Sequence, residues 1–214
     1  MDFLPVTQTI PIEREYEGWL TRGIEDYFRE LSVPAQVFAV LPRYERTWPA
    51  DEAIDVNGKV LGIQVKRPVL DHPAGPNDFA RLKWSLAQPR HQLNLVFNHR
   101  EILFCLPTFT NRDCRREALQ HAVFLTPIDS TSSSVWYDNS RAHSYPNASE
   151  SPRWGLVAEG FMRCSIGHQL GGQTFGDWMR SLDGRGRSES EDVDSAVAEG
   201  SLVVIAIPGP LSAI

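Results

Sequence analysis

The pair Asn57-Gly58, inside the segment PADEAIDVNGKVLGIQVKRP at residues 49–68, constrains the fold of this chain more than any other feature. Apolar residues alternate on both sides of it, and Asn-Gly favours a type I′ turn because that turn needs positive φ at both central positions. A two-residue turn also fixes the strand register, which places Val56 opposite Lys59. The segment therefore predicts a β-hairpin.

The register decides which side chains share a face, because directly opposed residues point to the same side of a hairpin. We expect the buried face to carry Ile54, Leu61, Ile63 and Val65. The other face carries Asp51, Ala53, Asp55, Gly62, Gln64 and Lys66. Asp51 lies opposite Gln64, with Cβ atoms about 5 Å apart, whereas Asp55 lies roughly 13 Å further along. One divalent cation could contact Asp51 and Gln64, but it could reach Asp55 only through a bulge.

Apolar periodicity predicts the remaining elements. A helix is expected over residues 13–31, between Pro11 and Pro34. Its apolar stripe contains Tyr16, Leu20, Ile24, Tyr27 and Leu31, with Phe28 at the edge. Glu17 lies within this stripe. Further elements are strands at 36–41, 92–98 and 101–109 and helices at 77–88 and 111–125; residues 154–170 fit either type. This order predicts an α/β core with a central mixed β-sheet flanked by helices.

Composition divides the chain into a core at residues 1–125, an extension packed on it at 126–182, an acidic linker at 183–200 and an apolar segment at 201–214. We expect the linker to be disordered and the last segment to dock as a strand on the body or a partner. Of the net charge of −6, the linker contributes −4 and the rest −2. A nucleic-acid partner would therefore need a local basic patch rather than a global field.

Three features bear on the compartment of the chain. No run of about 18 apolar residues predicts a membrane span, and the first fifteen residues lack the basic and apolar regions of a secretion signal. The three cysteines are few and odd in number, which favours a reducing environment over a disulfide framework. A cytoplasmic location is expected.

Asp51, the Asn57-Gly58 turn and Gln64-Val65-Lys66 together resemble the PD-(D/E)xK nuclease superfamily, most closely its archaeal Holliday-junction-resolvase and Mrr-like branches. In that superfamily an aspartate ends one strand, an acid-x-lysine lies on the next, and a glutamate comes from the preceding helix, which Glu17 matches. Pro49-Ala50-Asp51 is one residue longer than the family's Pro-Asp, and Gln64 replaces the second acid, as in Mrr-like members. The resemblance covers residues 13–110 and implies a restriction-endonuclease-like core.

The resemblance also implies roles for the residues of the motif. Asp51, the side-chain carbonyl of Gln64 and the main-chain carbonyl of Val65 would hold Mg²⁺ or Mn²⁺. Lys66 would orient a water or stabilise developing phosphorane charge, and Glu17 would act through a water or as a further ligand. Asp55 is the alternative acid, and Glu13 and Glu25 compete with Glu17. Cations expected on the DNA backbone are Arg67, Arg81, Lys83 and Arg90, with a second cluster at Arg112, Arg115 and Arg116.

Each of these residues also has an ordinary structural interpretation. Gln64 and Lys66 alternate as polar residues do on any solvated strand face, and a carboxylate at a helix edge often contacts only water. Cys114, His121, Cys164 and His168 match no standard zinc spacing, and Cys105 and Cys164 lie among apolar residues like core cysteines. His72 is the only histidine near the expected site.

Two functions remain open at this point. The first is a Mg²⁺-dependent endodeoxyribonuclease acting in repair, recombination or defence. The second is a catalytically inactive protein of the same fold that serves as a nucleic-acid-binding or assembly subunit. A homodimer or a protein partner bound through the C-terminal segment fits either one.

Overall fold

The computed structural model describes residues 10–45, 47–71, 81–87, 93, 96–126, 132–137 and 147–182. The main sheet contains β1 (Gln36–Ala39), β2 (Glu52–Val56), β3 (Lys59–Val65), β6 (Ile102–Pro107) and β7 (Ala122–Leu125) in that order, with the short β9 (His168–Gln169) on β3. The β3–β6 pair is parallel and the other described pairs are antiparallel. The protein is therefore an α/β protein with a mixed sheet, as the sequence predicts.

The predicted hairpin is confirmed in its turn and in its register. Asn57 and Gly58 have φ of 52° and 73°, as a type I′ turn requires. Val56 pairs with Lys59 and Asp55 with Val60. Every residue of β3 is buried, so the central strand is covered on both faces and the alternation of polar residues along it does not mark a solvated face.

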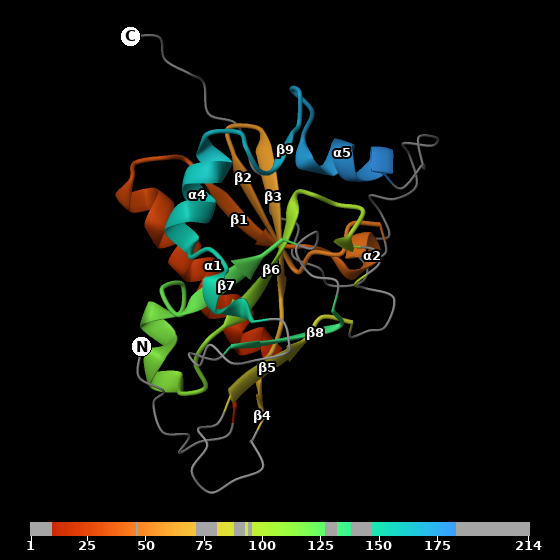
Figure 1. Ribbon diagram of the computed structural model, residues 1–214. Coiled ribbons are helices and arrows are strands. Elements are labelled where there is room, and N and C mark those ends of the chain that lie inside the picture. The colour runs from red at the N-terminus through yellow and green to blue at the C-terminus, as the bar shows by residue number, and fades with distance from the viewer. Residues whose placement is uncertain are drawn as a thin grey trace, which may run out of the picture.

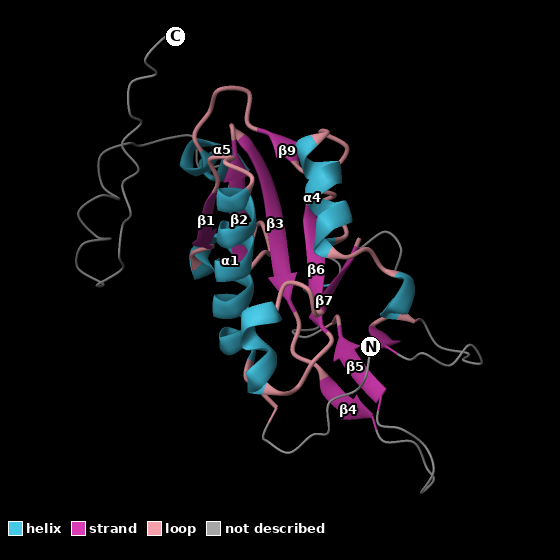
Figure 2. Ribbon diagram, turned by 90° about the vertical axis from the view of Figure 1, so that its left-hand side faces the viewer, coloured by secondary structure: helices cyan, strands magenta, loops and turns pink. Residues whose placement is uncertain are grey.

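Helices cover both faces of the main sheet (Figure 1). The helices α1 (Glu13–Glu30) and α4 (Trp154–Met162) lie on one side, seen in front of the strands in Figure 2. Their core residues pack against Ile54, Leu61, Ile63 and Val65, the face expected to be buried. On the other side lie α2 (Pro42–Glu45), α5 (Phe175–Leu182) and a second core that includes Trp48, Trp84 and Trp178.

Helix α1 confirms the first predicted helix, with one correction to its apolar stripe. Tyr16, Leu20 and Ile24 are buried as expected, but Phe28 is fully buried and Leu31 is 47% exposed. Phe28 packs edge-on against Trp154 of α4, with ring centroids 6.0 Å apart. Because α4 covers that side of α1, the buried stripe runs through Phe28 and leaves Leu31 at the end of the helix in solvent.

The helix expected over residues 77–88 is wrong where the structure describes it. Arg81–Ser85 form β5, which lies between β4 (Val69–Asp71) and β8 (Ser134–Tyr137) in a three-stranded antiparallel sheet. Leu82, Trp84 and Leu86 are buried, and they alternate with partly exposed residues in the two-residue period of a strand. This small sheet follows directly from the end of β3 and lies below the main sheet in Figure 1.

Two further sequence predictions are also corrected. Within residues 92–98, predicted as a strand, the described residues form a helical turn in which the Phe97 amide donates to the Leu93 carbonyl at 3.1 Å. Within 111–125, predicted as a helix, the chain forms a 3₁₀ helix, η1 (Arg112–Glu117), and then strand β7. The strand forms because Val123 and Phe124 are covered on opposite faces, one in each core. The strand predicted at 101–109 is confirmed as β6.

The remaining described elements follow residue 126. They are β8, a short 3₁₀ helix η3 (Ala148–Glu150), α4, β9 and α5. The predictions for the acidic linker at 183–200, for the apolar segment at 201–214 and for His72 fall outside the described residues. None of the helices in the described ranges combines the length and the hydropathy that crossing a membrane requires.

Candidate metal centre

Three carboxylates converge where the first half of α1 approaches the ends of β2 and β3. Glu13 and Glu17 lie one turn apart on α1, and Asp51 directly precedes β2. One carboxylate oxygen from each lies within 4.8 Å of the others. Two oxygens bound to one Mg²⁺ or Mn²⁺ at about 2.1 Å are at most roughly 4 Å apart. The group therefore fits a hard divalent cation after a small inward movement of its side chains.

Contacts on both sides of α1 fix the position of Glu13 and Glu17. The Tyr16 hydroxyl donates to the Phe109 carbonyl at 2.8 Å, which ties the helix to the chain following β6. The Arg112 guanidinium donates to both carboxylate oxygens of Glu15 at 2.8 and 2.7 Å. Such bidentate pairs have a defined geometry. The helix that carries two of the three acids is thus anchored at its N-terminal turns.

Asp51 is held by the end of β3 next to it. Its Oδ2 accepts hydrogen bonds from the Val65 amide at 2.7 Å and from Gln64 Nε2 at 2.5 Å. The predicted neighbours of Asp51 are therefore beside it, as the hairpin register requires. Gln64 presents an amide nitrogen to Asp51, however, and its role as a metal ligand through the carbonyl, like that of Val65, stays a prediction.

Lys66 and Arg67 follow β3 and border the same group. Lys66 is only 4% exposed, and burial lowers its pKa, while the charges of Glu13 and Asp51 act in the opposite direction. The Arg67 amide donates to Glu13 Oε2 at 3.1 Å, which links the main chain after the motif lysine to the first turn of α1. An ammonium group thus lies in the field of two of the three carboxylates.

The pKa shifts of Asp51 and Glu17 show that burial disfavours the ionised forms of these two carboxylates. Burial is the main cause that raises the pKa of Asp51 to about 7, the charge of Glu17 raises it further, and the Val65 amide and Lys66 oppose the shift. Burial also raises the pKa of Glu17, against the hydrogen bond that Arg14 donates to it at 3.0 Å. A bound cation would favour the ionised form of both carboxylates.

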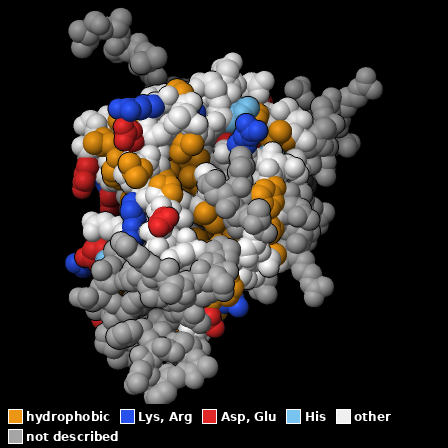
Figure 3. Space-filling view, viewed as in Figure 1, with side chains coloured by type: hydrophobic (Ala, Val, Ile, Leu, Met, Phe, Trp, Pro, Cys, Tyr) orange, Lys and Arg blue, Asp and Glu red, His pale blue; other side chains and the backbone are white. Residues whose placement is uncertain are grey.

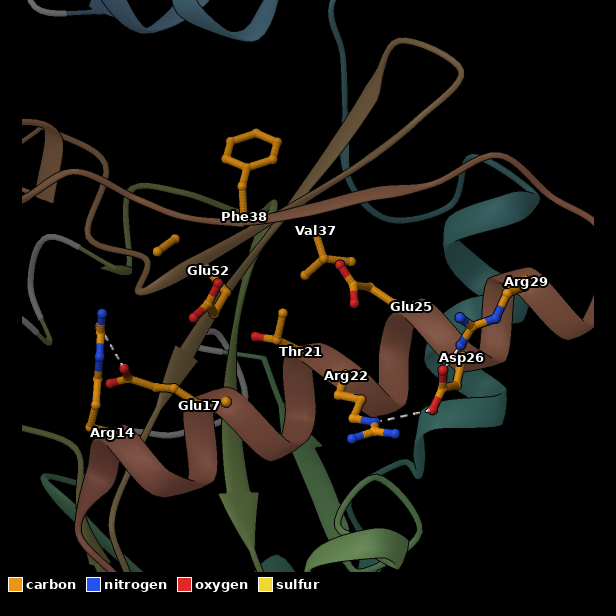
Figure 4. A pocket seen from close by; sticks show the side chains of 12 residues that line it. Arg14, Glu17, Thr21, Arg22, Glu25, Asp26, Arg29, Val37, Phe38 and Glu52 are labelled. Carbon is orange, nitrogen blue, oxygen red and sulfur yellow. Dashed lines mark hydrogen bonds and ion pairs between the residues drawn. The ribbon is translucent and has the colours of Figure 1, made fainter. Parts of the chain in front are cut away.

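Glu52 is a further acid near this group that the sequence analysis did not single out. It is the first residue of β2, and its side chain points from the strand toward α1 (Figure 4). It is 7% exposed, and burial, followed by the charge of Glu17, raises its pKa to about 7. Glu13 was only a competitor of Glu17 in the sequence, although its spacing of four residues from Glu17 on a helix was the signal that both share a face.

The two other candidate acids lie elsewhere. Asp55 Oδ1 accepts a hydrogen bond from the Gly58 amide at 3.0 Å, so this carboxylate stabilises the hairpin turn. Glu25 lies two turns along α1 from Glu17, where it lines a cavity together with Glu52. Neither belongs to the group of three carboxylates found among the described residues.

The cations predicted on the DNA backbone are spread over several elements. Arg67 is exposed beside the carboxylates, where its side chain donates to the Ile10 carbonyl at 3.1 Å. Lys83 lies on the small sheet with its ammonium 4.9 Å from the ring centre of Trp136. Arg81 begins β5 opposite Asp71, and Arg90 lies outside the described residues. On the face of the molecule seen in Figure 3, acidic and basic side chains are interspersed among the coloured residues.

Of the second cluster of cations, Arg112 pairs with Glu15, whereas Arg115 and Arg116 are exposed on η1.

The prediction that Cys105 and Cys164 are core cysteines is correct for only one of them. Cys105 is buried in the core, but Cys164 is exposed at a position with φ of 61°, because it follows α4 in a turn rather than in an apolar strand.

No protein-family model, curated protein or solved structure matches this chain. The fold and the carboxylate group are therefore the features that bear on the class of this protein.

Proposed function

We propose that this protein is a metal-dependent nuclease of the PD-(D/E)xK superfamily that hydrolyses phosphodiester bonds in DNA. The observation that carries the proposal is the convergence of Glu13, Glu17 and Asp51 within 4.8 Å, beside Lys66 at the end of the next strand. Carboxylate oxygens are the ligands that Mg²⁺ and Mn²⁺ prefer, and a lysine next to them is suited to a phosphoryl group.

The order of the elements also supports the proposal, including a restriction-endonuclease-like core. One helix precedes three antiparallel strands, and the next strand of the main sheet, β6, pairs in parallel with β3. The connection between them contains the small sheet and a helical turn rather than the helix predicted at 77–88. The segment 77–88 lies within residues 13–110, which the resemblance covers, so the strand found in place of this helix removes one supporting feature.

The residues of the group would divide the work as follows. A divalent cation supplies Lewis-acid activation of the scissile phosphate and of a water. Asp51 and Glu17 would bind it, and Glu13 would complete the set while it accepts the Arg67 amide. Lys66, buried and close to these charges, would stabilise negative charge that develops on the phosphate. Arg67, exposed beside the carboxylates, would contact the DNA backbone.

One specific observation favours the second candidate, an inactive nuclease-fold subunit that binds DNA or a protein partner. Gln64 replaces an acid and donates its amide to Asp51, so it contributes no negative charge to the group. A centre with fewer charges binds a divalent cation more weakly. Glu13 compensates for this deficit, which is why we prefer the active enzyme.

The test is cleavage of supercoiled and linear plasmid DNA with Mg²⁺ or Mn²⁺ by the wild type, Asp51→Ala, Lys66→Ala and Asp55→Ala. We expect the Asp51 and Lys66 variants to lose at least a hundredfold in rate. Asp55→Ala is the matched control, because its carboxylate belongs to the turn, and it should retain activity wherever it folds. Activity that survives both Asp51→Ala and Lys66→Ala would rule out this centre, and metal binding without cleavage by the wild type would favour the inactive subunit.

A further inference from the structure

The cavity that Glu25 and Glu52 line lies beside the carboxylate group, between α1 and strand β1 (Figure 4). Its volume is about 620 Å³, which falls within the range of small-molecule sites. Charged residues from four turns of α1 line one side of it, and Val37, Phe38, Ala39 and Glu52 come from the sheet. Gly18 leaves part of the helix surface bare, since a Cβ added there would meet nothing within 4 Å.

The cavity is lined by a buried acid, one of whose carboxylate oxygens has no hydrogen bond among the described residues. This acid is Glu52, which is only 7% exposed and whose Oε2 accepts no hydrogen bond in the part of the chain that the structure describes. The side chain points toward Glu17 and into the space beside Thr21, whose hydroxyl lies close enough to lower the pKa of Glu52 against the effect of burial (Figure 4). A buried carboxylate oxygen that accepts no hydrogen bond costs free energy, so a site that retains one is suited to a ligand that supplies donors.

The rim of the cavity carries arginines that are already paired. Arg14 pairs with Glu17 at 3.0 Å, and Arg22 and Arg29 both pair with Asp26. The lining contains three arginines and four acids, which give it a net negative charge once Glu17 and Glu52, whose pKa values burial raises, are both ionised. Because the acids include the deepest group, Glu52, the cavity favours a cation over an anion.

We propose that the cavity between α1 and β1 binds a small organic cation, through a guanidinium or primary ammonium group that donates to Glu52. Such groups carry positive charge and only donors, which complements a carboxylate that can only accept. The size of the cavity and the apolar side chain of Val37 suit an alkyl chain better than a bare metal ion. Glu52 also lies outside the group of three carboxylates assigned to the metal. The proposal is independent of DNA cleavage, since it does not require the metal centre.

The experiment is a titration of the ¹⁵N-labelled full chain with agmatine and with cadaverine at pH 8 and constant ionic strength, followed by amide chemical shifts. We expect saturable shifts in α1, β1 and β2, and a dissociation constant at least tenfold higher in Glu52→Gln. Gly18→Leu should weaken binding to the same extent by filling the cavity, and it favours the helix of the free protein. The control is Glu159→Gln on the surface of α4, which should stay within twofold of the wild type.

Three results would overturn the proposal. They are the absence of saturable shifts with both amines, wild-type affinity in a folded Glu52→Gln variant, or wild-type affinity in Gly18→Leu. A parallel titration with Mg²⁺ distinguishes the two sites. Shifts that Mg²⁺ alone produces at these amides, and that Glu52→Gln abolishes, would assign the cavity to a metal and contradict the proposal.

Discussion

The pH dependence of stability offers a sharp test of the carboxylate group. In the folded protein the pKa of Asp51 is raised from 3.8 to about 7. The folded state therefore binds more protons than the unfolded state between these values, so stability is fully present below about pH 4 and is lost as the pH rises to about 7. A difference of this size corresponds to at most about 4 kcal/mol. Water screens part of it because Asp51 is only partly buried, and we expect about 2 kcal/mol.

The perturbation is Asp51→Asn, which keeps an oxygen for the Val65 amide and removes the titrating group. The variant should gain stability relative to the wild type as the pH rises from 4.5 to 8. For a chain of this size 2 kcal/mol corresponds to about 4–8 °C in Tm. Burial also raises the pKa of Glu52 to about 7, so Glu52 lowers the stability further as the pH rises, both in the wild type and in Asp51→Asn. Thermal melts at half-unit pH steps, without divalent ions, measure the difference.

Adding Mn²⁺ should counteract the loss of stability that the wild type shows as the pH rises. The ion competes with protons for the carboxylates, so its stabilising effect should grow with pH. At a hundredfold excess over Kd it amounts to about 2.7 kcal/mol. Glu159→Gln serves as the control and should behave as the wild type. A Tm difference between wild type and Asp51→Asn that is constant or moves in the opposite direction with pH would refute the reasoning.

The remaining predictions concern packing and the motif lysine. Gly62→Ala should destabilise the fold by about 1–3 kcal/mol in urea unfolding, because its Cβ would lie 2.6 Å from the buried ring of Trp48. Gly58→Ala should lower the free energy of unfolding by about 1–2 kcal/mol, since Gly58 has φ of 73°. Gly18→Ala, within α1, should raise it by up to about 1 kcal/mol because alanine favours the helix. Equal effects of the two changes in urea unfolding would contradict both predictions. Lys66→Met should abolish DNA cleavage and raise Tm, because burial disfavours the ammonium; a lower Tm would show that Lys66 stabilises the fold.

The parts of the fold that local sequence determines were predicted correctly. The hairpin depends on two residues with positive φ and on alternation within a few positions of them. Helix α1 depends on a sustained period of 3.6 residues between two prolines. In both cases the pattern and the observed structure lie within one continuous segment, so no distant partner had to be known.

The small sheet could not be predicted in the same way. Residues 81–85 include the good helix formers Arg81, Leu82 and Lys83, and Asn77 and Asp78 before them are of the residue types that cap helices. They form a strand because β4 and β8, one of them some fifty residues away, pair with both edges. Tertiary pairing of this kind overrides helix propensity. The alternation of Leu82, Trp84 and Leu86 was the one local signal of a strand.

The candidate site was predicted in part for a similar reason. The register of the hairpin placed Asp51 beside Gln64 and Val65, which the structure confirms. The contribution of α1 depends on how the helix docks on the sheet, and one sequence does not determine that geometry. In the sequence Glu17 is therefore one of several candidate acids. The docking of α1 against the sheet is what brings Glu13 beside Asp51 and Glu52 beside Glu17.

The most direct test of the proposed metal centre is anomalous diffraction from crystals soaked in Mn²⁺. The account predicts a peak bonded to carboxylate oxygens of Asp51 and Glu17 at about 2.1–2.3 Å, with Glu13 beside it and no peak in crystals of Asp51→Asn. A wild-type crystal with Mn²⁺ bound elsewhere, or with no anomalous peak between α1 and the end of β3 at saturating Mn²⁺, would contradict it.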